Sequence, residues 1–250
     1  VWQKNYLQGE LLQTQLAYWD EQLAGAPELI DLRTDVPRPA TRTTTGRSEL
    51  FTVPIALSES LRRLSRSEGV TLFMALLAAF QALLYKYSGQ TDIVIGSPIA
   101  GRQRTELEGL IGFFVNTLAL RVDLSGNPTF GELLHKVREV CLGAYAHQDL
   151  PFERLVEELQ PERSLSHNPL IQVMFELENV RRGAARQSNQ IPPQQSETAI
   201  FDLVLSLRET GEEIQGTIEY STDLFAAPTI QRMAQHFLTL LEQIVANPKA

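Results

Sequence analysis

Apolar residues recur along much of this chain at the spacing of one helix face. Near the start they fall at Leu12, Leu16, Trp19 and Leu23, three to four residues apart. A period close to 3.6 residues predicts an amphipathic helix that buries one side, here over residues 7–24. The same pattern predicts further helices over 58–68, 71–87, from Thr129 through Ala144, after Pro151, and over 228–246.

The starts of three helices carry capping signals. Ser58 is expected to cap the helix over 58–68, and Thr129 with Glu132 has the spacing of a capping box. Pro151 suits the first position of the short helix that follows it.

The helix over 71–87 is apolar nearly all round, which indicates burial on several sides. Its apolar run, Leu72 to Tyr85, is broken only by Gln81 and is too short to cross a bilayer, so we expect a core helix. Cys141 falls on the apolar face of another predicted helix and is interpreted as buried packing rather than a nucleophile.

Shorter segments are rich in β-branched and apolar residues and bounded by turn residues, as strands are. Because helices and strands alternate without a strict rhythm, the expected class is α/β, a mixed sheet with helices packed on its faces. The predicted strands are 48–55, 92–96, 112–122, 170–177, 201–207 and 214–220. Between the fourth and fifth lies 181–198, rich in Arg, Gln, Ser and Pro, which is expected to be a long loop.

Composition narrows the function only by exclusion. The 250 residues carry a net charge of -8, which argues against nucleic acid, since nucleic-acid binding needs basic patches. One cysteine excludes an internal disulfide, and no cluster has the spacing of metal ligands. No signal peptide is recognised, so a cytoplasmic location is expected. The chain begins at Val1 within a helical pattern, which favours a segment of a longer polypeptide.

Three polar segments stand out between the core elements. They are Ile111-Gly-Phe-Phe-Val-Asn-Thr117, His147-Gln-Asp-Leu-Pro-Phe-Glu153 and Arg163-Ser-Leu-Ser-His-Asn-Pro-Leu170. In this order and spacing they closely resemble three consecutive motifs of the condensation domains of nonribosomal peptide synthetases. Val1-Trp2, Asp35-Val-Pro-Arg-Pro39 and Gly96-Ser-Pro-Ile-Ala-Gly-Arg102 match further stretches of that family. The resemblance covers essentially the whole chain and is weakest in 181–198.

The resemblance implies a chloramphenicol acetyltransferase-like sandwich that forms one half of a two-halved domain. In the family a tunnel runs between the halves, and donor and acceptor carrier proteins deliver phosphopantetheine-bound substrates to it. The acceptor amine attacks the donor thioester and forms an amide. The family's catalytic motif, HHxxxDG, ends the N-terminal half. This sequence has only His135, His147, His167 and His236 and no such motif, so it matches the C-terminal half over 1–250.

What the resemblance implies for single residues is limited to one wall of the tunnel. Arg102 matches a family arginine on the loop that lines the tunnel floor, with a surface ion pair as the alternative. Asn168 matches an asparagine facing the active site, with a turn-forming role as the alternative. Asn116, placed mid-strand where asparagine is disfavoured, is expected to have a specific hydrogen-bonding role, more structural than catalytic.

The second motif segment, residues 147–153, which includes Gln148, is interpreted as mainly structural. His147 ends a helix, where histidine often binds carbonyl groups, so it is not taken as the base. Asp149, just before Pro151, is expected to cap a helix. His167 lies where the family often carries arginine, so no role is assigned to it.

The implied partners are the N-terminal half, the two carrier proteins and an adjacent adenylation domain, with no cofactor bound directly, no nucleic acid and no membrane. Without its other half the chain is expected to be inactive and, because apolar surface is exposed, to self-associate or to be less stable. Residues 181–198, the family's crossover region, are expected to be mobile.

Three alternatives remain open. One is a non-catalytic docking module for carrier proteins or neighbouring domains. Another is an independent trimeric acyltransferase using His147. The third is a heterocyclisation or epimerisation relative.

Overall fold

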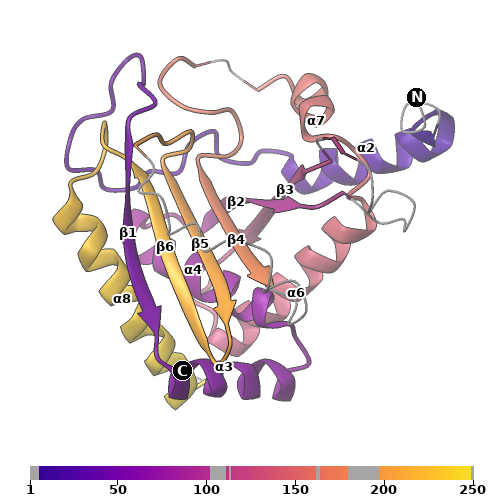
Figure 1. Cartoon of the computed structure of the whole chain (residues 1–250). Coiled ribbons are helices and arrows are strands. Elements are labelled where there is room, and N and C mark those ends of the chain that lie inside the picture. Colours follow the sequence, from indigo (N-terminus) through magenta and orange to yellow (C-terminus); the bar gives the residue numbers. More distant parts are fainter. Residues whose placement is uncertain (1–5, 102–110, 113, 162–163, 180–196, 249–250) are drawn as a thin grey trace.

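The structure is a computed structural model, and it describes residues 6–101, 111–112, 114–161, 164–179 and 197–248. Within these ranges the elements form a six-stranded mixed sheet in the order β1-β6-β5-β4-β2-β3 (Figure 1). The strands are β1 (Gly46–Val53), β2 (Asp92–Ile99), β3 (Asn116–Asp123), β4 (Val173–Asn179), β5 (Leu203–Thr210) and β6 (Glu213–Ser221). The expected α/β class with a mixed sheet is confirmed.

Pairing is antiparallel at both ends of the sheet and parallel in its centre. β1 pairs with β6, β6 with β5, and β2 with β3 in antiparallel fashion, whereas β4 runs parallel to both β5 and β2. A parallel pair requires a crossover connection. The segment that joins β4 to β5 is the predicted long loop, of which only residues 197–198 are described.

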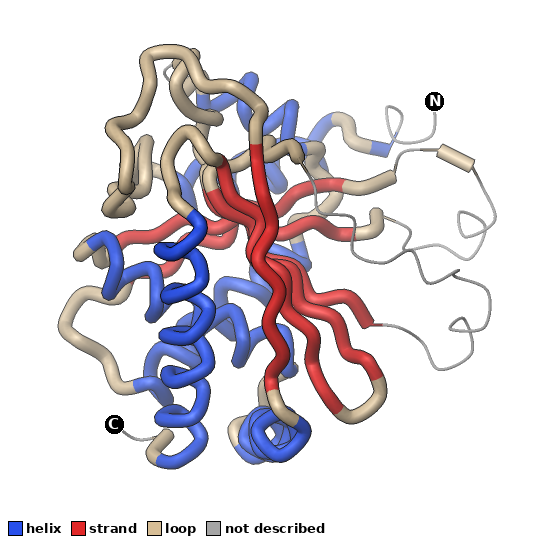
Figure 2. Tube along the Cα trace, turned by 60° about the vertical axis from the view of Figure 1, so that its left-hand side comes forward, coloured by secondary structure: helices blue, strands red, loops and turns tan. Residues whose placement is uncertain are grey.

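Four helices cover one face of the sheet: α3 (Ile55–Ser67), α4 (Leu72–Ser88), α6 (Phe130–Ala146) and α8 (Ala227–Ala246). Figure 2 shows them on one side of the twisted sheet. Two further helices of the described residues, α2 (Gly9–Leu23) and α7 (Phe152–Leu159), lie near the β3 edge of the sheet (Figure 1).

The core lies between the sheet and α4, as the apolar sequence of that helix predicts. Residues Leu76, Leu77 and Leu84 of α4 are fully buried. Phe80 packs edge-on against Phe237 of α8. No single helix among the described residues is long and apolar enough to cross a membrane, and α3 and α4, which together meet that criterion, are bent by 105°.

Most predicted elements are present, with shifted ends. The capping box of α6 is confirmed, since Thr129 and Glu132 bond to each other's backbone N–H groups. The cap predicted at Ser58 is wrong: α3 begins at Ile55 after Pro54, and Ser58 is buried in its first turn, where its hydroxyl donates to the Val53 carbonyl. A serine hydroxyl serves either place, so sequence alone misplaced the start.

Two further boundaries differ because side chains and turns override the local pattern. Pro151 is the N-cap of α7 rather than its first helical residue. The strand predicted from 170 begins only at Val173, because Leu170 has a left-handed backbone with φ of 62°. A strand needs negative φ values, so it starts after that turn.

Candidate functional site

The side chain of Asn116 joins the first two motif segments. Its Nδ2 donates to the carbonyl oxygens of Gln148 at 3.0 Å and Leu150 at 2.8 Å. Its Oδ1 accepts from the backbone N–H groups of Thr117 and Phe152, both at 2.9 Å. An asparagine amide has two N–H donors and an oxygen that accepts two bonds, so every hydrogen-bonding position is occupied by backbone. We call Asn116 with residues 147–152 the Asn116 joint.

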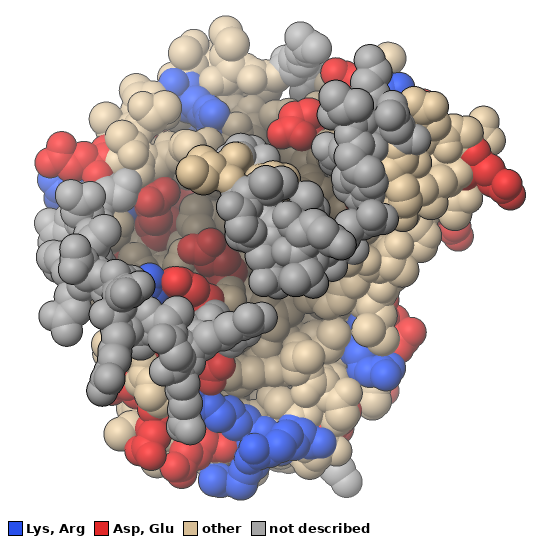
Figure 3. Space-filling view, turned by 45° about the vertical axis from the view of Figure 1, so that its right-hand side comes forward, with Lys and Arg blue, Asp and Glu red and all other residues tan. Residues whose placement is uncertain are grey.

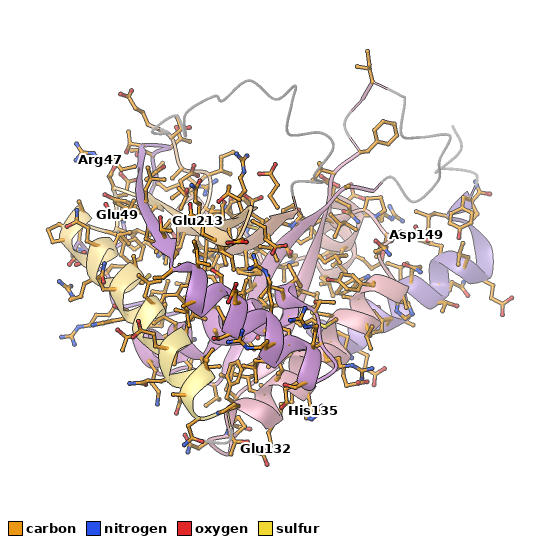
Figure 4. All side chains as sticks on the ribbon, turned by 60° about the horizontal axis from the view of Figure 1, so that its bottom comes forward. Arg47, Glu49, Glu132, His135, Asp149 and Glu213 are labelled. Carbon is orange, nitrogen blue, oxygen red and sulfur yellow. The ribbon has the colours of Figure 1, made fainter. Side chains whose placement is uncertain are left out.

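The structure corrects the expected position of Asn116 in its strand and shows the hydrogen bonds that its side chain makes. Asn116 is the first residue of β3 and not a mid-strand residue, because residues 111–112 and 114–115 lie outside any strand. The specific hydrogen bonds expected of it are present, and all of them join backbone groups. Asp149 does not cap α7, since that helix has no side-chain cap; Figure 4 shows it near α2, far from Arg47 and Glu49 at the β1 edge. Gln148 donates from Nε2 to the Tyr145 carbonyl at 2.7 Å.

His147 links α6 to α2. It is the C-cap of α6, as expected, and its Nδ1 lies 2.8 Å from the Gly143 carbonyl oxygen. Because a carbonyl only accepts, Nδ1 carries the proton. The ring stacks on Tyr18 of α2, with centroids 3.9 Å apart, and its backbone carbonyl accepts from Trp19 Nε1 at 2.9 Å. These contacts place His147 between α6 and α2, as the structural interpretation of this residue requires.

Burial raises the pKa of several groups beside this junction. Cys141 is fully buried, as expected, and burial raises the pKa of its thiol to about 12. Burial, with a smaller contribution from Cys141, raises the pKa of Tyr18 to about 12 and also raises that of Tyr145. A thiol held protonated is a poor nucleophile, which supports a packing role for Cys141.

The third motif forms a separate turn before β4, which we call the Asn168 turn (residues 164–172). Asn168 is partly exposed, and its Nδ2 donates to the Ile200 carbonyl at 2.8 Å. Among the described residues, no donor bonds to its Oδ1. Leu170 is strained, since a bulky residue with φ of 62° is unfavourable by about 1–2 kcal/mol. Because β2 lies between β4 and β3 in the sheet, this turn and the Asn116 joint are distinct places.

Gln172 holds the Asn168 turn from inside the protein. Only 3% of this polar residue is exposed, and its amide is satisfied on both sides. Its Nε2 donates to the carbonyls of Asn168 at 2.8 Å and Glu28 at 2.9 Å, and its Oε1 accepts from Ile30 N–H at 3.1 Å. Its own carbonyl accepts from the backbone of Asp202 at 2.9 Å.

The Arg38–Asp202 ion pair also holds the Asn168 turn, through the Ser166 carbonyl. The Arg38 guanidinium donates to both carboxylate oxygens of Asp202, at 3.1 and 2.5 Å, and to the Ser166 carbonyl at 3.3 Å. The Asp202 side chain is 5% exposed and the Arg38 side chain 18%. A bidentate arginine–carboxylate contact fixes the relative orientation of the two side chains as well as their distance. Arg38 therefore ties the loop before β1 to the Asn168 turn and to the start of β5.

The sequence alone did not single out this support. Asp202 stands between apolar residues, at Phe201 and Leu203, and a charge in such a run signals a buried partner. The partner, Arg38, is 164 residues away and could not be identified from spacing. Arg102 lies outside the described residues, so its predicted place on the tunnel floor stays a prediction, and most of 181–198 also lies outside them.

The face of the sheet opposite α3, α4 and α8 is polar along the parallel strands β4 and β5. Glu176 lies beside Ser206, whose hydroxyl donates to its carboxylate, and Glu178 pairs with Arg208 at 2.6 Å. Central parallel strands are usually buried and apolar on both faces. Figure 3 shows acidic side chains deep in a hollow on this side of the molecule. This face therefore meets water, and we call it the open sheet face.

The other three histidines lie on different elements. His135 is on the exposed side of α6 (Figure 4), and His236 of α8 lies 2.8 Å from the Tyr87 hydroxyl. His167 contacts the Asn168 carbonyl at 3.2 Å. Over the described ranges, no three His, Cys, Asp or Glu side chains are grouped so as to hold a metal ion.

Relatives of known sequence share this whole chain. One of the proteins that make up the linear gramicidin synthase of Brevibacillus parabrevis is 54% identical over 99% of the chain, which spans 3% of that protein. The phosphinothricin tripeptide synthetase PhsC from Streptomyces viridochromogenes is 44% identical over 99% of the chain, which spans 23% of it. The chain thus covers a small part of the curated proteins it matches.

Solved structures share the fold. A four-domain nonribosomal peptide synthetase bound to AMP and glycine matches 96% of the chain with a TM-score of 0.90 and 30% identity, over 20% of its own length. The X-domain from teicoplanin biosynthesis matches 100% of the chain with a TM-score of 0.90 and 28% identity, over 59% of its length. The family model described as the condensation domain matches residues 1–250. The chain therefore belongs to the condensation domain family.

Proposed function

We propose that this chain is the C-terminal half of a condensation domain that forms amide bonds between carrier-bound aminoacyl or peptidyl groups. The observation that carries the proposal is the open sheet face. A sheet covered by helices on one face and polar on the other suits one wall of a wet tunnel. The X-domain chain, of which this chain covers 59%, is long enough to include a second half.

The chemistry sets what each half must supply. The neutral amine nitrogen of the acceptor attacks the donor thioester carbon, the carbon–sulfur bond breaks, and a thiol leaves while the amine gives up a proton. Such a step needs close orientation of the reactants and stabilisation of the charged tetrahedral species. In our proposal the N-terminal half supplies the catalytic histidine, and this half supplies positioning. The chain alone is then inactive.

Three motif residues are assigned to the wall or its support. Asn168 is the proposed wall residue, because its amide is partly exposed and Oδ1 has no bond to a described residue. Arg102 is proposed to line the floor on the strength of its sequence match alone. Asn116 is proposed to support the wall from the joint, since its amide is saturated by backbone.

The proposed partners follow from the same reaction. Donor and acceptor carrier proteins bring their phosphopantetheine arms to the tunnel, and the amino acid is loaded by an adjacent adenylation domain. No cofactor is proposed to bind this half directly. The reaction is proposed to take place in the cytoplasm, where ATP for adenylation is available.

Reconstitution tests the proposal. This chain is mixed with a separately expressed matching N-terminal half and two loaded carrier proteins, and the amide product is measured by mass spectrometry. We expect product only when both halves are present. Product from this chain alone would contradict the division of roles and direct attention to His147.

A second candidate function is a non-catalytic docking module. It is favoured by one relative: the teicoplanin X-domain, 28% identical with a TM-score of 0.89, is known in a complex with OxyB. A module of this kind would bind a carrier protein or neighbouring domain yet give no amide with any N-terminal half. Carrier binding measured by calorimetry, without product in the reconstitution, would select this function.

A further inference from the structure

We propose that Arg38 and Asp202 are positioning residues for the condensation reaction: their ion pair holds the strained Asn168 turn in the shape that presents Asn168 to the tunnel. This inference rests on the proposed function for its catalytic consequence, whereas the holding of the turn is independent of it. It assigns a role to two residues that belong to none of the three polar motif segments.

The first support is the strain itself. Leu170 has φ of 62° although its side chain packs against the hydrophobic core. A bulky residue persists in that region only where its surroundings hold it, and such residues gather at functional sites. Gln160 also has positive φ, at 44°, but it is the exposed C-cap of α7, where a left-handed residue is ordinary.

The second support is the number of anchors that converge on the turn. Arg38 binds the Ser166 carbonyl, Gln172 binds the Asn168 carbonyl, and Asn168 itself binds the Ile200 carbonyl. Two residues after Ile200 comes Asp202, whose carboxylate holds Arg38. The turn is therefore held by its own Gln172 and by groups from two distant parts of the chain, Arg38 and residues 200–202.

The third support is the burial of the pair. A carboxylate that is 5% exposed is costly to desolvate, and a buried ion pair is weak evidence for added stability. A pair placed where it fixes the geometry of a neighbouring backbone fits a positioning role better. The pair thereby determines the direction of the Asn168 carboxamide, whose Oδ1 accepts no hydrogen bond from a described residue.

The test removes both charges at once. In Arg38→Met/Asp202→Leu no buried charge is left unpaired, so the melting temperature should stay close to that of the original chain. Hydrogen exchange at the backbone amides of 164–172 should rise by about tenfold, because the turn opens locally. In the reconstituted domain, the rate at saturating carriers should fall by about 10- to 100-fold with little change in the KM for either carrier.

A matched control is present at the far end of β5 from Asp202. Arg62 donates to the Glu209 carboxylate at 2.9 and 3.0 Å and to the Glu212 carbonyl at 2.8 Å, at the opposite end of β5. This pair has the same chemistry, an arginine shared between a carboxylate and a backbone carbonyl. Arg62→Met/Glu209→Leu should leave exchange in 164–172 and the condensation rate unchanged.

The two proposals fail in different ways. If 164–172 stays protected in Arg38→Met/Asp202→Leu, the pair does not hold the turn and the inference is wrong. If the turn opens but the rate equals that of the control variant, the positioning role in catalysis is wrong. If the unmodified chain gives no amide with its N-terminal half, the proposed function fails, and increased exchange still supports the holding role.

Discussion

Two motif asparagines of this chain are used in opposite ways. Asn116 has all four hydrogen-bonding positions on the backbone of its own protein and locks β3 to the segment before α7. Asn168 makes one side-chain hydrogen bond to a described residue, the Ile200 carbonyl, and stands near the strained Leu170. Both residues lie in family motifs, yet over the described residues only Asn168 keeps an amide oxygen without a hydrogen bond. The two asparagines therefore differ in how many hydrogen bonds their amides make within the described protein: Asn116 makes four, and Asn168, the functional candidate, makes one.

The largest effect is expected from breaking the joint. Asn116→Ala leaves two carbonyls and two N–H groups at the joint without their partner, so we expect the free energy of unfolding to fall by about 2–4 kcal/mol. Urea denaturation followed by circular dichroism measures it. Asn116→Asp is the matched variant: it keeps an acceptor for the two N–H groups but sets a charged oxygen against the carbonyl oxygens of Gln148 and Leu150, so its stability should be no higher than that of Asn116→Ala. A loss below that of Asn168→Ala would contradict the comparison.

A medium effect is expected from alkaline pH, and Cys141, beside the joint, should contribute most to it. The folded-state pKa of Cys141 is raised to about 12 by burial, above its ordinary value of 9.0. Below about pH 9 both states keep the proton and stability is unaffected; as pH rises toward 12, only the unfolded state ionises, so stability is lost.

At pH 10 the free energy of unfolding should be lower by about 1 kcal/mol, and Cys141→Ala should remove most of that slope. Tyr18 and Tyr145, whose pKa values are also raised by burial, contribute in the same direction. Denaturation at pH 8 and pH 10, with and without the substitution, measures it. Equal slopes in the two proteins would show that the thiol is hydrated in the folded state.

The smallest effect on stability, with a clear effect on activity, is expected at the turn. Asn168→Ala removes one partly exposed hydrogen bond, so the free energy of unfolding should change by about 0.5–1 kcal/mol. In the reconstituted domain the amide-forming rate should nevertheless fall by about tenfold or more, since one wall contact is lost. Asn168→Asp, similar in shape but charged, tests whether the amide donor is needed. An unchanged rate in Asn168→Ala would make this asparagine structural as well.

The α/β class, the apolar core helix α4 and the capping box of α6 could be predicted from sequence because each depends on local spacing. Burial of Cys141 followed from the same periodicity. The start of α3 and the start of β4 could not be predicted. In the first, Ser58 suits a cap and a buried first turn equally, and in the second the left-handed backbone of Leu170 delays the strand.

For the site, the sequence by itself determined the family through three motifs and indicated the candidate residues Arg102, Asn116 and Asn168. Only the tertiary structure decided how the environments of Asn116 and Asn168 differ, because their surroundings are built from distant residues. At the joint, Asn116 bonds to Gln148, 32 residues away, and beside the turn Arg38 bonds to Asp202, 164 residues away. The Arg38–Asp202 pair is the clearest case: local pattern shows that a buried charge needs a partner, and only folding selects which arginine meets it.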